Sequence, residues 1–478
     1  MIGAAQLDRA LNPRTVAVVG DAQARNYRWL RCMSTFQGKV YSVQVDPKEI
    51  PGIEALGIPN YQSLTEISDE IDYVLVAVPR NVAPVVLRDC ITKQVGGVTM
   101  FTSGFAETDS AEGQELQEQI TEMARDARLV LIGPNCMGLY NPALGVRFGE
   151  NQASGFEGDV TFLSQSGGHG GDFATAAQAS GVPIRKVVSF GNGVVLGIAD
   201  FLEYFTEDDD TSYISMYLEG LREGPRFFQS LRRTTLKKPV VVWKGGLSDA
   251  GQRATASHTA SLAGSAEVWD AMYRQTGAIP VTSVSEMIDV LRALRELPPF
   301  TGRGIGLTGG SGGQSVAMAD TFSRSGLRVP TLTGDSYERL SSWFRVIGAS
   351  FGNPIDMGSN RTEIETIMEV LISDAHVDCL VVQLRPGSDD PDDQRRLDAQ
   401  LDALVQAREH AQKPVAAIVY SSAPLDEGPA ITAIDERLRA IGIPAFPTYE
   451  RAAAALAKVS AYYRFREAAL AATDGESA

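Results

Sequence analysis

The chain contains 478 residues, of which 44% are apolar and 21% are charged, as in a folded globular protein of about three domains. Its formal net charge of −16 repels polyanions, which argues against nucleic acid or an anionic membrane as a partner. The four cysteines show no CxxC or metal-ligand spacing, and neither a signal-peptide pattern nor an apolar run of about 18 residues is present, so we expect a cytoplasmic protein.

Short apolar, β-branched segments alternate with helix-length amphipathic segments along the whole chain. They form three sets: residues 15–20, 40–46, 73–79, 96–104 and 128–135; residues 159–167, 185–192, 213–220, 238–246 and 278–283; and residues 304–310, 327–333, 378–386, 413–420 and 443–450. Continuous apolar strands separated by helices predict parallel sheets that are covered on both faces. We therefore predict an α/β protein with three parallel-sheet domains, at residues 1–151, 152–297 and 298–478, the last border lying in the proline- and glycine-containing segment RELPPFTGRG.

The first strand, in TVAVVGDAQARNYRWL, reaches a turn where a dinucleotide-like ligand would lie in a parallel α/β domain. Only Gly20 is present there and no GxGxxG follows, so the cofactor fingerprint is weak.

The segment FLSQSGGHGGDFATAAQA at residues 162–179 combines a strand end, a Ser- and Gly-rich turn and a helix, which is the pattern of an anion site. Ser164 and Ser166 would cap the helix or bind an oxyanion, and Gly167 and Gly168 would allow close approach to the backbone. The alternative is an ordinary helix N-cap with a tightly packed glycine. Residues 306–322 show the same pattern and have the same alternative.

Glu219 ends the strand at residues 213–220, and the carboxyl ends of parallel strands line the ligand crevice. A carboxylate at that position can hold a histidine tautomer. The alternative is a solvated turn residue.

His258 is one of four histidines and lies in the small-residue segment RATASHTASLAG. No second ligand stands at metal spacing, whereas imidazole is a good nucleophile near neutral pH and its small neighbours leave it accessible. The alternative is a hydrogen-bonded structural or surface residue. His169 is a competing nucleophile, and His376 and His410 have the context of surface residues.

The order and spacing of many short motifs resemble the nucleoside-diphosphate-forming acyl-CoA synthetases, the succinyl-CoA synthetase superfamily. The matching stretches run from about residue 10 to 465 and include VAVVG, DYVLVAVP, TSGFAE, LIGPNCMGLYNP, FLSQSGG, SFGN, YLEG, KKPVVVWKGGLSDAGQRATASHTASLAG and GNPIDMG. The resemblance is to the α-type part of that family. It implies a Rossmann-like CoA-binding domain, a ligase domain with a phosphohistidine loop, and a second flavodoxin-like ligase domain.

The resemblance implies that His258 carries a phosphoryl group between a nucleotide site and an acyl–CoA site, and that Glu219 orients its ring. It also implies that the phosphate is held by Ser164, Gln165, Ser166, Gly167 and Gly168, at a helix N-terminus that favours negative charge.

The resemblance further implies CoA as a substrate, contacted by Gly20, Lys48, Val78, Pro79, Asn135 and Cys136. The first loop departs from the family pattern. It is shorter, has no second glycine, and places Asp21 where an anion would approach, with Arg25 and Arg28 as the candidates to compensate.

No segment resembles the nucleotide-grasp domain that phosphorylates the histidine in this family. The resemblance therefore implies a separate ATP-grasp (β-type) subunit that supplies Mg-ATP, a hetero-oligomer, and no metal bound by this chain. The expected reaction is acid + CoA + ATP = acyl-CoA + ADP + phosphate, with a small carboxylic acid or its acyl phosphate as substrate. Two alternatives stay open, namely the same phosphoryl relay with a non-CoA acceptor such as an amine, and a non-catalytic CoA- or acyl-CoA-binding module.

Overall fold

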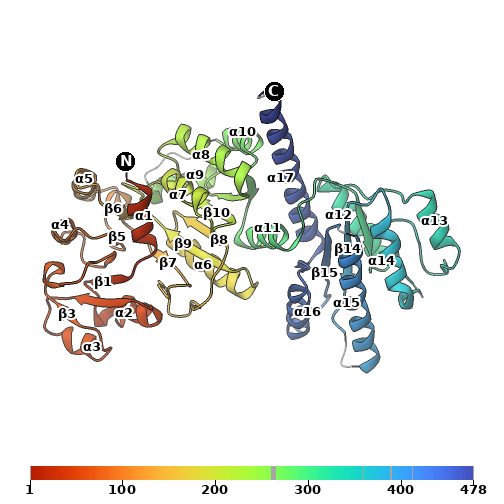
Figure 1. Ribbon diagram of the computed structural model, residues 1–478, viewed down its shortest axis with the longest axis horizontal. Helices are drawn as coiled ribbons and strands as arrows, with labels where there is room; N and C mark the ends of the chain where they lie inside the picture. The colour runs from red at the N-terminus through yellow and green to blue at the C-terminus, as the bar shows by residue number, and fades with distance from the viewer. Residues whose placement is uncertain (1, 260–264, 359, 388–389, 412, 477–478) are drawn as a thin grey trace. The chain divides into compact units, whose positions relative to one another are not determined.

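The computed structural model describes residues 2–476 except 260–264, 359, 388–389 and 412, and the side chains of residues 256–259 are among those outside the description. The chain divides into two compact units, Met1–Met287 and Ile288–Ala478 (Figure 1). The first unit contains two six-stranded sheets and the second a four-stranded sheet. The predicted fold class, α/β with three mostly parallel sheets, is confirmed, whereas the domain borders at residues 151 and 297 stay a prediction.

The first sheet is entirely parallel and has the strand order β3-β2-β1-β4-β5-β6. Every residue of β1 and β4 is buried, because helices cover both faces of the sheet. The chain order reverses between β1 and β4, which is where such folds form a ligand crevice. The strands are β1 (Thr15–Val19), β2 (Lys39–Val43), β3 (Asn60–Tyr61), β4 (Tyr73–Val76), β5 (Gly97–Met100) and β6 (Val130–Ile132). The helices are α1 (Ala4–Leu11), α2 (Arg28–Cys32), α3 (Ile50–Glu54), α4 (Ala83–Lys93) and α5 (Ala111–Asp126).

The second sheet has the order β12-β11-β10-β8-β9-β7, and its edge strand β7 is antiparallel to β9. Its strands are β7 (Gly138–Tyr140), β8 (Val160–Ser164), β9 (Ile184–Ser189), β10 (Tyr213–Leu218), β11 (Val240–Lys244) and β12 (Ile279–Val281). The helices are α6 (Gly167–Ala179), α7 (Ile198–Glu207), α8 (Gly224–Lys237), α9 (Asp249–Thr259) and α10 (Ala266–Thr276), and the chain passes into the second unit within α11 (Val284–Glu296).

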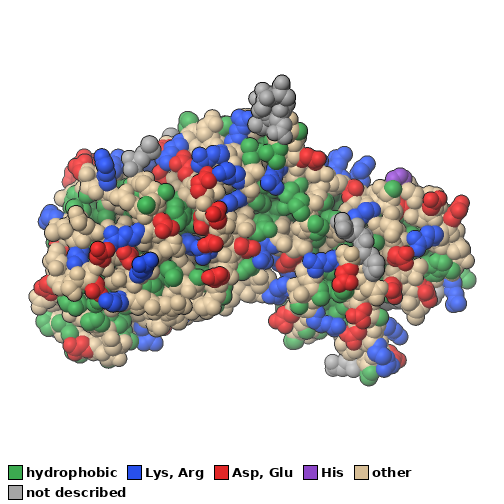
Figure 2. Space-filling model, viewed as in Figure 1, with side chains coloured by type: hydrophobic (Ala, Val, Ile, Leu, Met, Phe, Trp, Pro, Cys, Tyr) green, Lys and Arg blue, Asp and Glu red, His purple; other side chains and the backbone are tan. Residues whose placement is uncertain are grey.

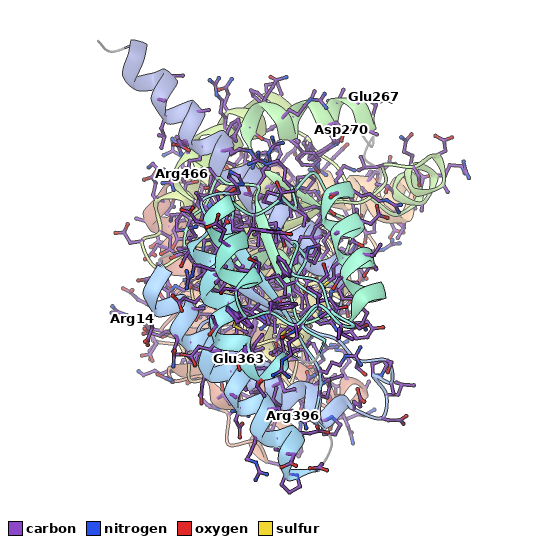
Figure 3. The ribbon with its side chains drawn as sticks, turned by 90° about the vertical axis from the view of Figure 1, so that its right-hand side faces the viewer. Arg14, Glu267, Asp270, Glu363, Arg396 and Arg466 are labelled. Carbon is purple, nitrogen blue, oxygen red and sulfur yellow. The ribbon has the colours of Figure 1, made fainter. Side chains whose placement is uncertain are left out.

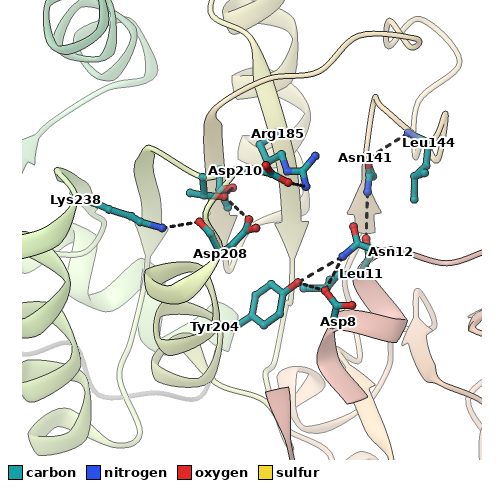
Figure 4. Close-up of polar contacts among 12 residues, drawn as sticks. Asp8, Leu11, Asn12, Asn141, Leu144, Arg185, Tyr204, Asp208, Asp210 and Lys238 are labelled. Atoms are coloured by element: carbon teal, nitrogen blue, oxygen red, sulfur yellow. Dashed lines mark hydrogen bonds and ion pairs between the residues drawn. The ribbon is translucent and has the colours of Figure 1, made fainter. Parts of the chain in front are cut away.

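Polar contacts join the two sheets of the first unit. Tyr204 on α7 donates to Asp8 Oδ1 on α1 at 2.7 Å, and Asn141 Nδ2 donates to the Leu11 carbonyl at 3.1 Å (Figure 4). Burial, and then Asp8, raises the pKa of Tyr204, which therefore stays a protonated donor. The two sheets are thus tied together through side chains as well as through the connecting chain.

The second unit has the parallel strand order β13-β14-β15-β16. The predicted strand at residues 327–333 is wrong, because this segment makes only an isolated bridge between Arg328 and Gly304 and continues through Pro330. The strands are β13 (Ile305–Thr308), β14 (Cys379–Leu384), β15 (Val415–Val419) and β16 (Ala445–Phe446). The helices are α12 (Gly312–Arg324), α13 (Gly334–Ser341), α14 (Ile364–Ser373), α15 (Pro391–Ala411), α16 (Gly428–Ala440) and α17 (Tyr449–Glu476).

The surface matches the acidic composition. On the described part of the face shown in Figure 2, basic side chains are interspersed with acidic ones and form no continuous basic stripe of the kind that binds nucleic acid. None of the described helices combines the length and the hydropathy that a bilayer-spanning segment requires.

Candidate active site

The carboxyl ends of three neighbouring strands meet at one edge of the second sheet. Strand β8 ends at Ser164, β10 at Leu218 directly before Glu219, and β11 at Lys244. The strands are parallel, with Tyr217 opposite Ser164 and Leu218 opposite Lys244. The predicted phosphate loop and Glu219 therefore lie at the same edge, where parallel sheets hold their ligands.

Two serine side chains shape the loop between β8 and α6. Ser164 Oγ donates to the Ser166 carbonyl at 2.7 Å and accepts from the Ser166 N–H at 3.1 Å. Ser166 is the N-cap of α6, and its Oγ accepts from the His169 N–H at 3.3 Å. The capping role foreseen for Ser166 is confirmed, and the N-terminus of α6 is an end of the helix that favours an anion.

The glycines of this loop differ in their surroundings. A Cβ on Gly167 would lie 2.8 Å from Met137 Cγ, so close packing requires glycine there. Gly168 is exposed, and a Cβ on it would approach nothing nearer than Ser166 Oγ at 3.8 Å. Met137 belongs to the turn that follows β6 of the first sheet, and its N–H donates to Ser189 Oγ at 3.1 Å. The predicted phosphate loop therefore adjoins the predicted CoA domain through Met137.

Gln165 links the loop to the strand end that carries Glu219. Its Oε1 accepts from the N–H groups of Glu219 at 2.5 Å and Gly220 at 3.0 Å, and its Nε2 donates to the Gly220 carbonyl at 3.0 Å. The side chain predicted to bind phosphate is thus engaged with the backbone of the neighbouring strand end.

Glu219 is only 7% exposed, so it is not the solvated turn residue of the alternative interpretation. Gln165 holds its N–H, and Lys244 Nζ donates to its carbonyl at 2.9 Å. Burial, followed by the charge of Glu219 and a hydrogen bond to its carboxylate, raises the pKa of Tyr217. The Glu219 carboxylate therefore faces the hydroxyl of Tyr217 at the sheet edge.

Sequence reasoning missed Lys244 as a residue of this site. Its side chain is almost fully buried, and its Nζ donates to the carbonyls of Glu219 and Gly245 and lies 5.5 Å from the centre of the Trp269 ring. Burial lowers its pKa to about 8. The available signal was a lysine that ends an otherwise apolar strand, in KPVVVWKGG.

His169 lies in the first turn of α6, at the same sheet edge. Its ring packs against Tyr217 and Trp243, with centroids 4.3 and 4.5 Å away. Its Nδ1 lies 3.5 Å from Asp172 Oδ2. The structure thus places this competing histidine beside the predicted phosphate loop.

The side chain of His258, the predicted phosphoryl carrier, lies outside the described residues. Its backbone belongs to the last turn of α9, which follows β11. Helix α9 packs against the 3₁₀ turn Ala106–Thr108, at the TSGFAE segment of the first sheet. The helix that carries His258 therefore lies between the edge of the second sheet and the first sheet.

At the crevice of the first sheet, Gly20 has φ +81°, and a Cβ there would lie 2.4 Å from Val78 Cγ1, so both the backbone conformation and the close contact favour glycine at this position.

Asp21 is buried and does not face a ligand, because its oxygens accept from the N–H groups of Ala22 and Leu30, both at 3.0 Å. Burial raises its pKa. The carboxylate expected to oppose an anion instead organises the turn into α2.

The two candidate compensating arginines are engaged with the protein itself. Arg25 donates to the carbonyls of Gly20 and Ala77, both at 2.9 Å. Arg28 donates to the Phe148 carbonyl at 2.9 Å. Neither guanidinium is therefore a fully free phosphate ligand.

The other predicted CoA contacts follow the ends of β2, β4 and β6. Lys48 and Pro79 are exposed, and Val78 is half-buried. Asn135 has φ +59° and donates to Asn192 Oδ1 at 3.4 Å. Cys136 is buried, which raises the pKa of its thiol to about 12, so it serves the packing of the turn rather than as a nucleophile.

Comparison with known proteins agrees with this geometry. A family model described as a CoA binding domain matches residues 14–142, and one described as a succinyl-CoA ligase like flavodoxin domain matches residues 157–294.

Two curated relatives and one solved structure cover most of the chain. The α subunit of ADP-forming acetate–CoA ligase II of Pyrococcus furiosus is 32% identical over 381 residues, covering 78% of this chain and 81% of that protein. The α subunit of ligase I of the same organism is 31% identical over 475 residues, covering 96% and 97%. The structure of dinucleotide-forming acetyl-coenzyme A synthetase 1 of Ca. Korarchaeum cryptofilum, in complex with phosphate and ADP, superposes with a TM-score of 0.82 at 28% identity, covering 96% of this chain and 97% of that one.

Proposed function

We infer the function of this chain from its family, because the chain belongs to the α subunits of the nucleoside-diphosphate-forming acyl-CoA synthetases. We propose that it catalyses acid + CoA + ATP = acyl-CoA + ADP + phosphate together with a separate ATP-grasp subunit that binds Mg-ATP. Two of its relatives are named as α subunits, which supports the proposal that this chain has a partner subunit. Its four cysteines are free and buried, as expected in a reducing compartment, so we place the reaction in the cytoplasm.

The proposed reaction has three balanced steps. A ring nitrogen of His258 attacks the γ-phosphorus of ATP, the P–O bond to ADP breaks, and a P–N bond forms. A carboxylate oxygen of the acid then attacks that phosphorus, and the ring nitrogen recovers the electron pair of the P–N bond. Finally the CoA thiolate attacks the acyl carbon and phosphate leaves, while the thiol proton passes to solvent.

Each predicted residue has a role in this scheme. Glu219 would hold the N–H of the His258 ring, so that the other ring nitrogen carries the phosphoryl group. The backbone N–H groups at residues 167–168 would bind the phosphoryl oxygens, since the N-terminus of the 13-residue helix α6 favours negative charge.

The observation that carries the proposal is the contact between the two predicted sites. Met137, which follows the Asn135–Cys136 turn of the CoA-binding domain, packs on Gly167 of the phosphate loop. An acyl phosphate held at α6 would therefore lie close to a thiol delivered from the first-domain crevice. Because proximity of the reactants removes much of the entropic barrier, this arrangement suits acyl transfer from phosphate to CoA.

Reconstitution tests the proposal. The chain is mixed with a co-purifying or gene-neighbouring ATP-grasp subunit, Mg-ATP, CoA and a panel of carboxylic acids, and acyl-CoA and ADP are quantified. Equal amounts of the two products are expected with at least one acid. ADP release without any acyl-CoA over the whole panel contradicts the proposal.

A second candidate function is favoured by the first loop. Arg25 locks the ends of β1 and β4 together, and Asp21 fills the turn into α2. In the second function, the acceptor of the acyl group is an amine or another nucleophile in place of CoA. Calorimetric titration of the chain with CoA separates the two functions, because only the first requires binding.

A further inference from the structure

A cavity of about 480 Å³ opens beside Glu219, at the carboxyl ends of β10 and β11. The phosphate loop follows β8, the neighbour of β10 on its other side. It lies between the loop after β10, the first turns of α8 and the length of α10. Its walls include Leu221, Phe228, Trp269 and Met272. Trp269 is only 3% exposed and packs near Phe227 and Tyr273, so this wall is buried and aromatic.

Lys244 supplies the one cationic group of the described lining. Its ammonium has three donors, and the described residues provide two acceptors, the carbonyls of Glu219 and Gly245. The other described neighbours of this ammonium are the Trp269 ring, whose centre lies 5.5 Å from Nζ, and the charge of Glu219, so an anionic ligand would compete with both for the third donor. A buried ammonium is costly unless it is paired, so an anion that enters this cavity gains a charge-assisted hydrogen bond.

The acidic side chains of α10 do not oppose such an anion from inside the cavity. Glu267 and Asp270 are exposed and absent from the lining (Figure 3). Val268, which does line the cavity, is 64% exposed and forms part of its open rim.

We propose that this cavity binds the carboxylic-acid substrate, with the carboxylate on Lys244 and an apolar tail against Trp269, Phe228 and Met272. The inference rests on the proposed function, which supplies the acid as the ligand. A volume of 480 Å³ falls in the range of sites that enclose drug-sized molecules. The cavity therefore selects an aryl or branched aliphatic acid over acetate. Since Lys244 Nζ lies 2.9 Å from the Glu219 carbonyl, the bound carboxylate lies at the strand end where the phosphoryl transfer is proposed.

A ligand-detected NMR titration of the intact chain with phenylacetate and with acetate tests the inference. Three variants accompany the wild type. Ala271→Trp fills the cavity from α10, Lys244→Met removes the ammonium, and Ala111→Trp places the same large side chain on the exposed first turn of α5 as a matched control. Thermal melts establish that each variant is folded.

Phenylacetate should bind the wild type and Ala111→Trp equally, and at least about tenfold more tightly than acetate. Lys244→Met and Ala271→Trp should each weaken phenylacetate binding by at least about tenfold, and the neutral phenylacetamide should bind weakly to every form. Undiminished binding to folded Ala271→Trp, equal affinity for the two acids, or no binding to the wild type overturns the inference. Because the titration needs neither ATP nor a partner, a failure of His258 phosphorylation would refute the proposed function separately.

Discussion

Removing the Gln165 side chain should loosen the backbone that presents Glu219. In Gln165→Ala the N–H groups of Glu219 and Gly220 lose their acceptor and the Gly220 carbonyl loses a donor. With a net value of about 1 kcal/mol for each of the three hydrogen bonds, local opening becomes easier by about 3 kcal/mol, which corresponds to about 150-fold faster amide exchange. The measurement is hydrogen–deuterium exchange of a peptide that spans residues 213–222, followed by mass spectrometry.

Gln178→Ala is the matched control, because Gln178 is exposed and accepts one backbone hydrogen bond, from the Ala153 N–H at 3.2 Å. This variant should leave the exchange of residues 213–222 unchanged. The reasoning fails if Gln165→Ala changes exchange in that peptide by less than about threefold, or if Gln178→Ala accelerates it equally. With the partner subunit present, Gln165→Ala should also slow phosphorylation of His258, because the carboxylate that orients the ring is less well placed.

Three further predictions concern the proposed reaction. Glu219→Gln should slow phosphorylation of His258 by about 100-fold with the fold intact, as measured by rapid-quench labelling; a change of only about twofold would exclude its role as the orienting group. The assembled enzyme with γ-labelled ATP should acquire an acid-labile, base-stable phosphate that is absent from His258→Asn and from the chain alone; label that persists in His258→Asn and disappears in His169→Asn would move the carrier to His169. Lys48→Ala should weaken CoA binding by about tenfold in calorimetry, because one charge-assisted phosphate contact of roughly 1.5 kcal/mol is lost; unchanged affinity would remove Lys48 from the CoA site.

Local patterns were sufficient to predict the fold class, because continuous apolar strands separated by helices leave parallel, doubly covered sheets as the stable arrangement. The same patterns gave a false strand at residues 327–333. That segment has strand composition, yet only Arg328 makes a bridge, to Gly304 just before β13. Burial against neighbouring elements decides whether such a segment joins a sheet, and a single sequence does not contain that information.

The sequence by itself determined the family, through the order of its motifs, and the group of candidate residues at strand ends, since parallel strands bring their carboxyl ends to one edge. The tertiary structure decided what those side chains contact. Asp21 caps a turn instead of facing an anion, Gln165 binds the backbone of residues 219–220, and Lys244 enters the site unforeseen. Asp21 accepts from Leu30 nine residues away, Lys244 donates to the Glu219 carbonyl 25 residues away, and Gln165 bonds to residues 54 and 55 positions away in the chain. Their hydrogen bonds depend on distances of a few ångströms that only the packed fold establishes.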